Sequence, residues 1–182
     1  RKWVGEQIES GAMFNARHLW LSIRPNGDAT PNKIERLELR ICDRISQPRI
    51  LAAVIALFEA RIWQVLESLE RGDRDLDPLA FRGDRELQEI CLRNERRVAE
   101  SSLDATITDW RTGDDLPMRE WVEACWRGCL PTARAHGFEE RLAPIGEILA
   151  DGNLAQQWLA QVAAGLSPRE VLRRSGFDPR SY

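Results

Sequence analysis

The chain has 182 residues, of which 43% are hydrophobic and 30% charged, and its formal net charge is −3. This composition is typical of a globular protein with one domain or two small ones, and it excludes a disordered or collagen-like chain. The near balance of charge argues against nucleic acid as the main partner, since such a domain needs a basic field. The longest apolar run covers only residues 50–58, whereas a membrane-spanning helix takes about 20 residues.

Four cysteines, Cys42, Cys91, Cys125 and Cys129, are too few for a disulfide scaffold in a chain of this length. No signal peptide opens the sequence, so we expect reduced thiols in a cytoplasmic protein. The alternative is a redox or zinc role for Cys125 and Cys129, which lie one helical turn apart without a histidine at ligand spacing.

The sequence starts at Arg1 instead of methionine, and we expect it to be part of a longer protein.

Two segments near the start have the alternating pattern of β-strands. They cover residues 15–24 and 33–43, and the turn-forming run PNGD at residues 25–28 follows the first. We predict an antiparallel pair, because this is the simplest arrangement of two neighbouring strands. One side of the pair is aliphatic and the other is polar. The polar side holds His18, Trp20, Arg24, Arg36, Glu38 and Arg40.

After Asp43 the apolar residues recur every three or four positions, which predicts helices. The first covers residues 50–69, with Pro48 in its first turn and a stop at Arg71-Gly72-Asp73. Its first half is apolar nearly all round, so we expect it to be covered on several sides and to pack on the aliphatic side of the strands. Further helices are predicted over 84–110, 117–136, 138–150, 153–164 and 167–174, with N-caps at Asn153 and Ser167 and a kink or break at Pro131.

The polar side of the strand pair has two possible interpretations. The simpler one is a solvated face with surface ion pairs, which antiparallel sheets often carry. The alternative is a cavity lined by anion-binding arginines beside a carboxylate. Glu38 and Arg40, two positions apart on one strand, would then present a ligand for a hard cation such as magnesium beside a donor for phosphoryl oxygens.

These strands resemble a known family. HLWLSIRP (18–25) and TPNKIERLELRICD (30–43) are similar to the aromatic-x-x-Ile-Arg-Pro and Leu-Glu-x-Arg-x-x-Asp strands of the glutamate–cysteine ligase and carboxylate–amine ligase superfamily. The resemblance is closest to the bacterial and cyanobacterial-type glutamate–cysteine ligases. Residues 94–105 also resemble the family's Asn-x-x-Arg-x-Ala helix ending in Leu-Asp-Ala, and residues 152–157 its Gly-x-x-Ala-x-x-Gln segment. Glu100 departs from related ligases, which carry arginine there, so we assign that helix no substrate role.

The resemblance implies a glutamine-synthetase-like fold whose curved antiparallel sheet holds ATP and magnesium. It implies ATP-dependent ligation of the glutamate γ-carboxylate to the cysteine amine through a γ-glutamyl phosphate, the first step of glutathione biosynthesis. Residue by residue, Glu38 becomes a Mg²⁺ ligand, and Arg40 stabilises charge on the transferring phosphoryl group. Arg24 binds phosphate or the substrate carboxylate. His18 and Trp20 face the same cavity as substrate or nucleotide contacts, although either could pack against a missing strand.

We therefore predict an α+β fold in which residues 1–182 form the C-terminal portion of a single ligase catalytic domain. Residues 1–45 would carry the active-site strands and residues 46–182 a helical layer. The expected partners are glutamate, cysteine, ATP and the missing N-terminal half of the same enzyme, with no nucleic acid and no membrane. The chain alone should be inactive, since the magnesium–ATP site of the family needs carboxylates on earlier strands. The alternatives are a ligase acting on another amine and a non-catalytic helical interaction domain.

Overall fold

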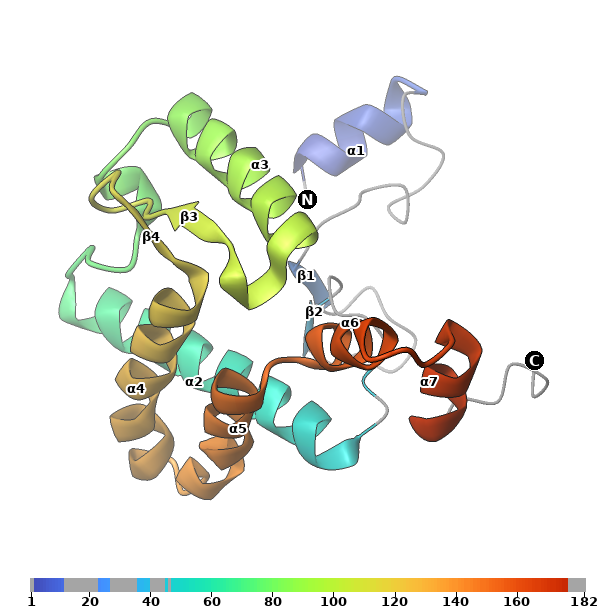
Figure 1. The fold of residues 1–182 in the computed structure, drawn as a ribbon. Helices are drawn as coiled ribbons and strands as arrows, with labels where there is room; N and C mark the ends of the chain where they lie inside the picture. The colour runs from blue at the N-terminus through green and yellow to red at the C-terminus, as the bar shows by residue number, and fades with distance from the viewer. Residues whose placement is uncertain (1, 12–22, 27–35, 40–44, 46, 177–182) are drawn as a thin grey trace. The chain divides into compact units, whose positions relative to one another are not determined.

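The computed structural model describes residues 2–11, 23–26, 36–39, 45 and 47–176 (Figure 1). The chain forms two compact units, Arg1–Ile45 and Ser46–Tyr182. In the described part, no helix is both long enough and apolar enough to span a bilayer. That both units belong to one ligase domain stays a prediction.

The first unit contains helix α1 (Lys2–Glu9) and an antiparallel ribbon of two strands, β1 (Ile23–Asn26) and β2 (Arg36–Leu39). The predicted antiparallel pairing is confirmed. The predicted turn is wrong in part, because Pro25 and Asn26 belong to β1 rather than to the connection. Proline is compatible with a strand edge, where its missing N–H leaves no ladder bond unmade. The sequence does not predict α1, whose 8 residues are too few to show a clear helical period.

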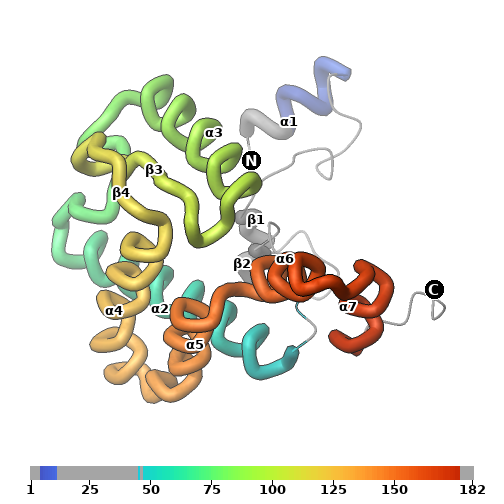
Figure 2. The backbone as a smooth tube through the Cα atoms, viewed as in Figure 1, coloured from blue at the N-terminus to red at the C-terminus, as the bar shows by residue number. Residues whose placement is uncertain are grey.

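The second unit is mainly helical, and Figure 2 traces its path. Its elements in chain order are α2 (Pro48–Arg71), α3 (Asp84–Ser101), β3 (Thr106–Thr108), β4 (Asp115–Pro117), α4 (Met118–Ala135), α5 (Ala143–Asp151), α6 (Leu154–Ala163) and α7 (Pro168–Arg174), with short 3₁₀ turns at Pro78–Ala80, Ser102–Asp104 and Glu139–Leu142. With the ribbon of the first unit, these elements confirm the predicted α+β class. The glutamine-synthetase-like sheet that the resemblance implies stays a prediction.

The predicted helix ends are largely confirmed by the caps. Gly72 ends α2 with a φ of 72°, a left-handed conformation that glycine adopts without strain. Asn153 caps α6: its side chain accepts from the Gln156 N–H at 3.0 Å, and the Gln156 side chain accepts from the Asn153 N–H at 3.1 Å. Ser167 and Glu170 form the same reciprocal box at the start of α7. Such boxes satisfy two helix N–H groups that otherwise lack a partner.

Two of the predicted helices differ from the structure. The prediction of a helix over 84–110 is wrong, because α3 ends at Ser101 and the hairpin β3–β4 follows. Ser102, at the break, has a φ of 54° that a helix cannot contain, and the β-branched run Thr106–Thr108 favours a strand. The prediction over 138–150 is correct only from Ala143, since a 3₁₀ turn precedes α5.

Pro131 does not split α4, which continues from Met118 to Ala135. Proline removes one helix hydrogen bond and crowds the preceding turn. Here the neighbouring residues Cys129, Thr132 and Ala133 are buried against the rest of the unit, so tertiary packing holds the last turn in place.

The core of the second unit lies where α2 meets α4, α5 and the 3₁₀ turn Glu139–Leu142. The contacting residues of α2 are small, because Ala56 and Ala60 are 2% and 0% exposed and pack with Cys129, Ala133 and Leu142. Small side chains let these helices approach closely. The expected cover on several sides is not seen within residues 47–176, since α2 also exposes large apolar side chains.

Candidate functional site

The ribbon β1–β2 carries the residues that the sequence singles out for chemistry. Its register makes Arg24 and Glu38 direct partners, with Asn26 opposite Arg36. Direct partners of an antiparallel pair belong to the same face, so these four polar positions share one face. The alternate pairs, Ile23 with Leu39 and Pro25 with Leu37, place the apolar positions on the other. The register therefore agrees with the predicted division into a polar and an aliphatic side.

The remaining residues of the predicted site lie outside the described residues. They are His18, Trp20 and Arg40. Their roles in nucleotide or substrate binding stay predictions, as do the predicted roles of Arg24 and Glu38.

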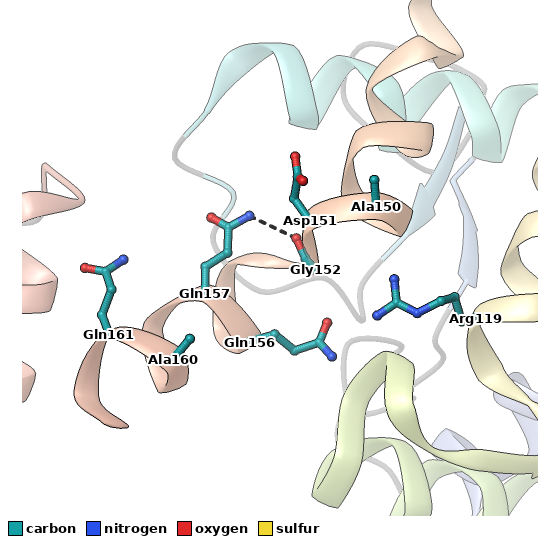
Figure 3. A pocket seen from close by; sticks show the side chains of 8 residues that line it. All are labelled: Arg119, Ala150, Asp151, Gly152, Gln156, Gln157, Ala160 and Gln161. Carbon is teal, nitrogen blue, oxygen red and sulfur yellow. Dashed lines mark hydrogen bonds between the residues drawn. The ribbon is translucent and has the colours of Figure 1, made fainter. Parts of the chain in front are cut away.

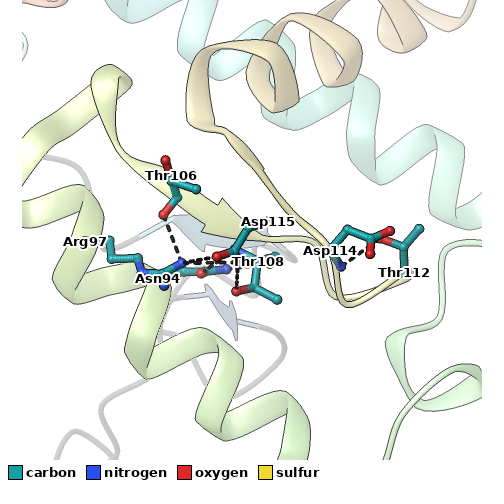
Figure 4. A network of polar contacts seen from close by, with 7 residues as sticks. All are labelled: Asn94, Arg97, Thr106, Thr108, Thr112, Asp114 and Asp115. Carbon is teal, nitrogen blue, oxygen red and sulfur yellow. Dashed lines mark hydrogen bonds and ion pairs between the residues drawn. The ribbon is translucent and has the colours of Figure 1, made fainter.

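A second set of polar residues, from the predicted family helix, holds the β3–β4 hairpin (Figure 4). The Asn94 amide in α3 donates through Nδ2 to the Thr108 carbonyl at 2.8 Å and accepts through Oδ1 from the Thr108 N–H at 2.9 Å. A planar amide has one donor and one acceptor group side by side, so it pairs with both backbone groups of one residue as a strand partner would. Both hydrogen bonds depend on the side-chain amide of Asn94.

Arg97 lies one turn further along α3 and contacts both strands of the hairpin. Its guanidinium donates to the Thr106 carbonyl at 3.2 Å and to Asp115 Oδ1 at 3.3 Å. The Thr108 hydroxyl donates to the same carboxylate at 2.5 Å. The Thr108 bond, followed by Arg97, lowers the pKa of Asp115 below its ordinary value. The network thus stabilises the ionised carboxylate and fixes the hairpin to α3.

The two helical family segments, residues 94–105 and 152–157, lie against each other although they are far apart in the sequence. The Gln156 Nε2 donates to Asp104 Oδ2 at 2.8 Å, and the Asn153 Nδ2 donates to the Ser102 hydroxyl at 2.5 Å. Arg119 of α4 joins them, because its guanidinium donates to Asp104 at 3.3 Å and to the Leu149 carbonyl. Residues from three helices and one turn therefore meet in one polar junction.

Comparison with known proteins assigns the chain to a family. The family model described as "Glutamate-cysteine ligase family 2 (GCS2)" matches residues 1–174. The chain belongs to glutamate–cysteine ligase family 2. This assignment confirms the family that the strand motifs indicate.

Two curated relatives match over most of the chain. It is 29% identical over 171 residues to "Putative glutamate--cysteine ligase 2" of Pseudomonas paraeruginosa (strain DSM 24068 / PA7), with 91% of this chain and 40% of that protein covered. It is 28% identical over 171 residues to "Putative glutamate--cysteine ligase 2-1" of Frankia casuarinae (strain DSM 45818 / CECT 9043 / HFP020203 / CcI3), with 94% of this chain and 39% of that protein covered. The chain thus spans about 40% of the length of the curated relatives it matches. No solved structure matches this chain.

The donor set of the ribbon fits one part of the magnesium–nucleotide site that the family resemblance implies. Glu38 has the hard carboxylate oxygens that Mg²⁺ prefers, and Mg²⁺ in nucleotide sites is typically held by one or two carboxylates together with phosphates and water. The register sets the arginine at position 24 directly opposite. A guanidinium is a two-pronged donor suited to phosphate oxygens. Residues 23–26 and 36–39 contain one carboxylate, so they supply at most one carboxylate ligand to the metal.

The polar junction opens onto a hollow of about 490 Å³ (Figure 3). Three of its polar lining side chains, Arg119, Gln156 and Gln157, take part in hydrogen bonds. The Gln157 amide donates to the Gly152 carbonyl at 2.9 Å, and Arg119 and Gln156 both bind Asp104. We interpret it as the open side of a helix junction. No motif marks Arg119 in the sequence, and only the structure places it beside the two family segments.

Three of the cysteines are free thiols, as predicted: Cys91, Cys125 and Cys129. Cys42 lies outside the described residues. The pKa of Cys125 is lowered to about 6. Hydrogen bonding with Cys129 lowers it most, partial burial raises it, and the positive charge of Arg61 also lowers it. The same hydrogen bond and burial raise the pKa of Cys129.

Proposed function

We propose that this chain is the C-terminal portion of an ATP-dependent glutamate–cysteine ligase. The enzyme would join the γ-carboxylate of glutamate to the amine of cysteine through a γ-glutamyl phosphate, in the first step of glutathione biosynthesis. The family match over residues 1–174 supports the reaction class. The observation that carries the site is the register, which pairs Arg24 with Glu38 within the motif-bearing strands.

In this mechanism the ribbon acts by positioning and by electrostatic stabilisation, which dominate phosphoryl transfer. Glu38 holds the magnesium ion, which screens the charge of the nucleotide phosphates when bound. Arg24 binds a phosphate or the substrate carboxylate. Arg40, two positions along the strand motif from Glu38, stabilises the charge that develops on the transferring phosphoryl group. His18 and Trp20 contact the nucleotide or the substrate.

The test uses the complete protein, expressed from the reading frame that contains these 182 residues. We expect ADP release that requires glutamate, cysteine and Mg²⁺ together, and a γ-glutamylcysteine product seen by mass spectrometry. The 182-residue chain alone, assayed in parallel, is expected to release no ADP, because the proposed site needs carboxylates from outside it. No ADP release above background from the complete protein with glutamate and any amine would contradict the proposal.

The same assay identifies the acceptor. Replacing cysteine in turn by other small amines separates a glutamate–cysteine ligase from a ligase of the same chemistry acting on another amine. A fold and a phosphate site do not by themselves select the amine, so this arm tests the substrate and leaves the reaction class standing.

A further inference from the structure

Cys125 and Cys129 form a pair of thiols on one face of α4. Residues four apart in an α-helix are neighbours on its surface, with Cβ atoms about 5–6 Å apart. Cys129 is fully buried in the core of the second unit, and Cys125 is half-buried against the same core. The two thiols are hydrogen-bonded to each other. The function proposed above uses neither of them.

Helix α2 presents polar groups to this pair. The Gln64 Oε1 accepts from the Cys129 Sγ at 3.7 Å and from the Arg61 Nη1 at 2.7 Å. The Gln64 Nε2 donates to the Gly128 carbonyl at 2.6 Å, which fixes the amide against α4. Arg61 also hydrogen-bonds the Cys129 sulfur. The contact of α2 with α4 is therefore polar at this one place, where the two sulfur atoms meet an amide and a guanidinium.

The charge of Arg61 is not balanced by the groups around it. Its guanidinium is half-buried and stays protonated at any ordinary pH. Within the part of the chain that the structure describes, Arg61 pairs with no carboxylate. Two neutral thiols supply no negative charge, whereas thiolates do. The surroundings of the pair therefore favour a bound state in which the sulfur atoms carry net negative charge.

The spacing of the two thiols separates their possible chemistries. A disulfide needs Cβ atoms about 3.5–4.5 Å apart, which is closer than one helical turn sets them, so an S–S bond would distort α4. A structural zinc site takes four ligands, and residues 2–11, 23–26, 36–39, 45 and 47–176 hold no group of three or more potential ligands.

An ion held between the two sulfur atoms suits the spacing better. It keeps them two metal–sulfur bonds apart, which is up to about 4.6 Å for bonds of about 2.3 Å, the length of a Zn–S bond. Thiolates are soft ligands and select monovalent copper among the biological cations that accept so few ligands. A single positive charge on the ion also leaves a complex with two thiolates negative, as the charge of Arg61 requires.

We propose that Cys125 and Cys129 bind one monovalent copper ion between their sulfur atoms. Binding releases both thiol protons, so two neutral thiols and one Cu⁺ give two protons and a bis-thiolate complex of net charge −1. Arg61 is the counter-charge of this complex and a donor to the Cys129 sulfur. The ion enters from the side of Cys125, since Cys129 is fully buried. The proposal goes beyond the proposed function and does not depend on ligase activity.

The test measures, without oxygen, the transfer of Cu⁺ to the complete protein from its coloured complex with bicinchoninate. We expect one ion per chain to leave the chelator. Cys125→Ala should weaken the binding at least about a hundredfold, since loss of even an outer partner of a metal ligand typically costs about 10–100-fold. Circular dichroism checks that this variant keeps its fold, which a half-buried position allows. A double variant, Cys42→Ser with Cys91→Ser, is the matched control and should bind as the unchanged protein does.

Two variants of Arg61 test the counter-charge separately from the ligands. Arg61→Gln should weaken the binding about tenfold, the scale of an outer partner, and Arg61→Lys should restore most of the loss because it keeps the charge. No transfer from the chelator, equal binding by Cys125→Ala and the unchanged protein, or loss of binding in the cysteine control would overturn the proposal. So would one ion per two chains, because sulfur atoms of two copies would then share it. A complete protein that binds Cu⁺ as expected and yet lacks ligase activity would contradict the proposed function and leave this inference standing.

Discussion

The indole of Trp126 in α4 lies directly against Gly146 in α5. A Cβ atom added at Gly146 would come within 2.9 Å of the indole Cη2, closer than real Cβ contacts allow. Glycine is otherwise unfavourable inside a helix by about 1 kcal/mol relative to alanine. Close packing of α4 on α5 therefore explains a glycine in the middle of α5.

This contact predicts opposite effects for two glycine substitutions. Gly146→Ala should lower the free energy of unfolding by about 1–3 kcal/mol, because the added methyl forces the indole to move. Gly128→Ala in α4 should raise it by about 0.5–1 kcal/mol, because nothing lies within 4 Å of a Cβ built there. Urea denaturation of the two variants beside the unchanged chain measures both. Equal effects of the same sign would show that α4 and α5 do not pack as described.

The two hydrogen bonds between the Asn94 amide and the Thr108 backbone predict a large loss of stability in Asn94→Ala. Asn94→Ala leaves the N–H and the carbonyl of Thr108 without their partners, and Thr108 is only 6% exposed. Two buried unsatisfied groups should cost about 2–4 kcal/mol in the free energy of unfolding. Arg96→Ala, at an exposed position of the same helix, is the control and should change it by less than about 0.5 kcal/mol. A loss no greater than that of the control would contradict a structural role for Asn94.

Much of the second unit follows from local patterns in the sequence. The start of α2 at Pro48, its end at Gly72 and the caps at Asn153 and Ser167 all depend on residues within one helical turn of the boundary. The hairpin after α3 could not be predicted from such local patterns. Its strands have three residues each, and they depend on contacts with Asn94 and Arg97 that a periodicity along the chain does not show.

The ribbon and the polar junction differ in the same way: the sequence predicts the faces of the ribbon, but it does not predict the junction. Alternation along β1 and β2 separates a polar from an apolar face, and the register agrees with that separation. The position of Arg119 beside Asp104 and Leu149 depends on how three helices meet. No spacing in the sequence indicates this meeting, so the polar junction emerges only from the tertiary structure.

The lowered pKa of Asp115 predicts how the hairpin responds to pH. A carboxyl group whose pKa is lower in the folded than in the unfolded state stabilises the fold above its ordinary pKa, here 3.8, and this stabilisation is lost as the pH falls through the folded value. Thr108→Val removes the hydroxyl that contributes most to the shift. We expect the Asp115 pKa to rise in this variant, and the stability difference from the unchanged chain to shrink below pH 3.8. An NMR titration of the Asp115 carboxyl measures the shift, and an unchanged pKa in Thr108→Val would contradict the network.

The proposed role of Arg40 predicts a loss of turnover in the complete protein. Arg40→Ala should lower kcat at least about a hundredfold with little change in fold, because loss of one donor to the developing charge costs about 2.7–4 kcal/mol of barrier. Arg40→Lys should recover only part of the rate, since lysine keeps the charge but loses the two-pronged geometry. Arg36→Ala, nearer the start of β2, is the control and should retain most of the activity. Near-normal turnover of Arg40→Ala at saturating substrates would contradict the assignment.

The proposed metal role of Glu38 predicts a changed requirement for Mg²⁺ in the complete protein. Glu38→Gln keeps the size of the side chain but replaces a carboxylate by a neutral amide, which is a poorer ligand for a hard cation. We expect the free Mg²⁺ concentration for half-maximal ADP release to rise about tenfold or more, since loss of even an outer-shell partner of a metal ligand typically costs about 10–100-fold in metal affinity. The rate is measured over a series of free Mg²⁺ concentrations at a fixed excess of ATP.

The register also allows Glu38 to act only as the cross-strand partner of Arg24. In that case Glu38→Gln would lower the free energy of unfolding by about 0.2–1 kcal/mol, the usual contribution of an opposite-charge pair across strands. The Mg²⁺ requirement would then be unchanged, and Arg24→Gln would have the same effect as Glu38→Gln. A metal ligand should instead raise the Mg²⁺ requirement in Glu38→Gln and leave it nearly unchanged in Arg24→Gln. The comparison of the two variants therefore separates a metal ligand from a surface ion pair.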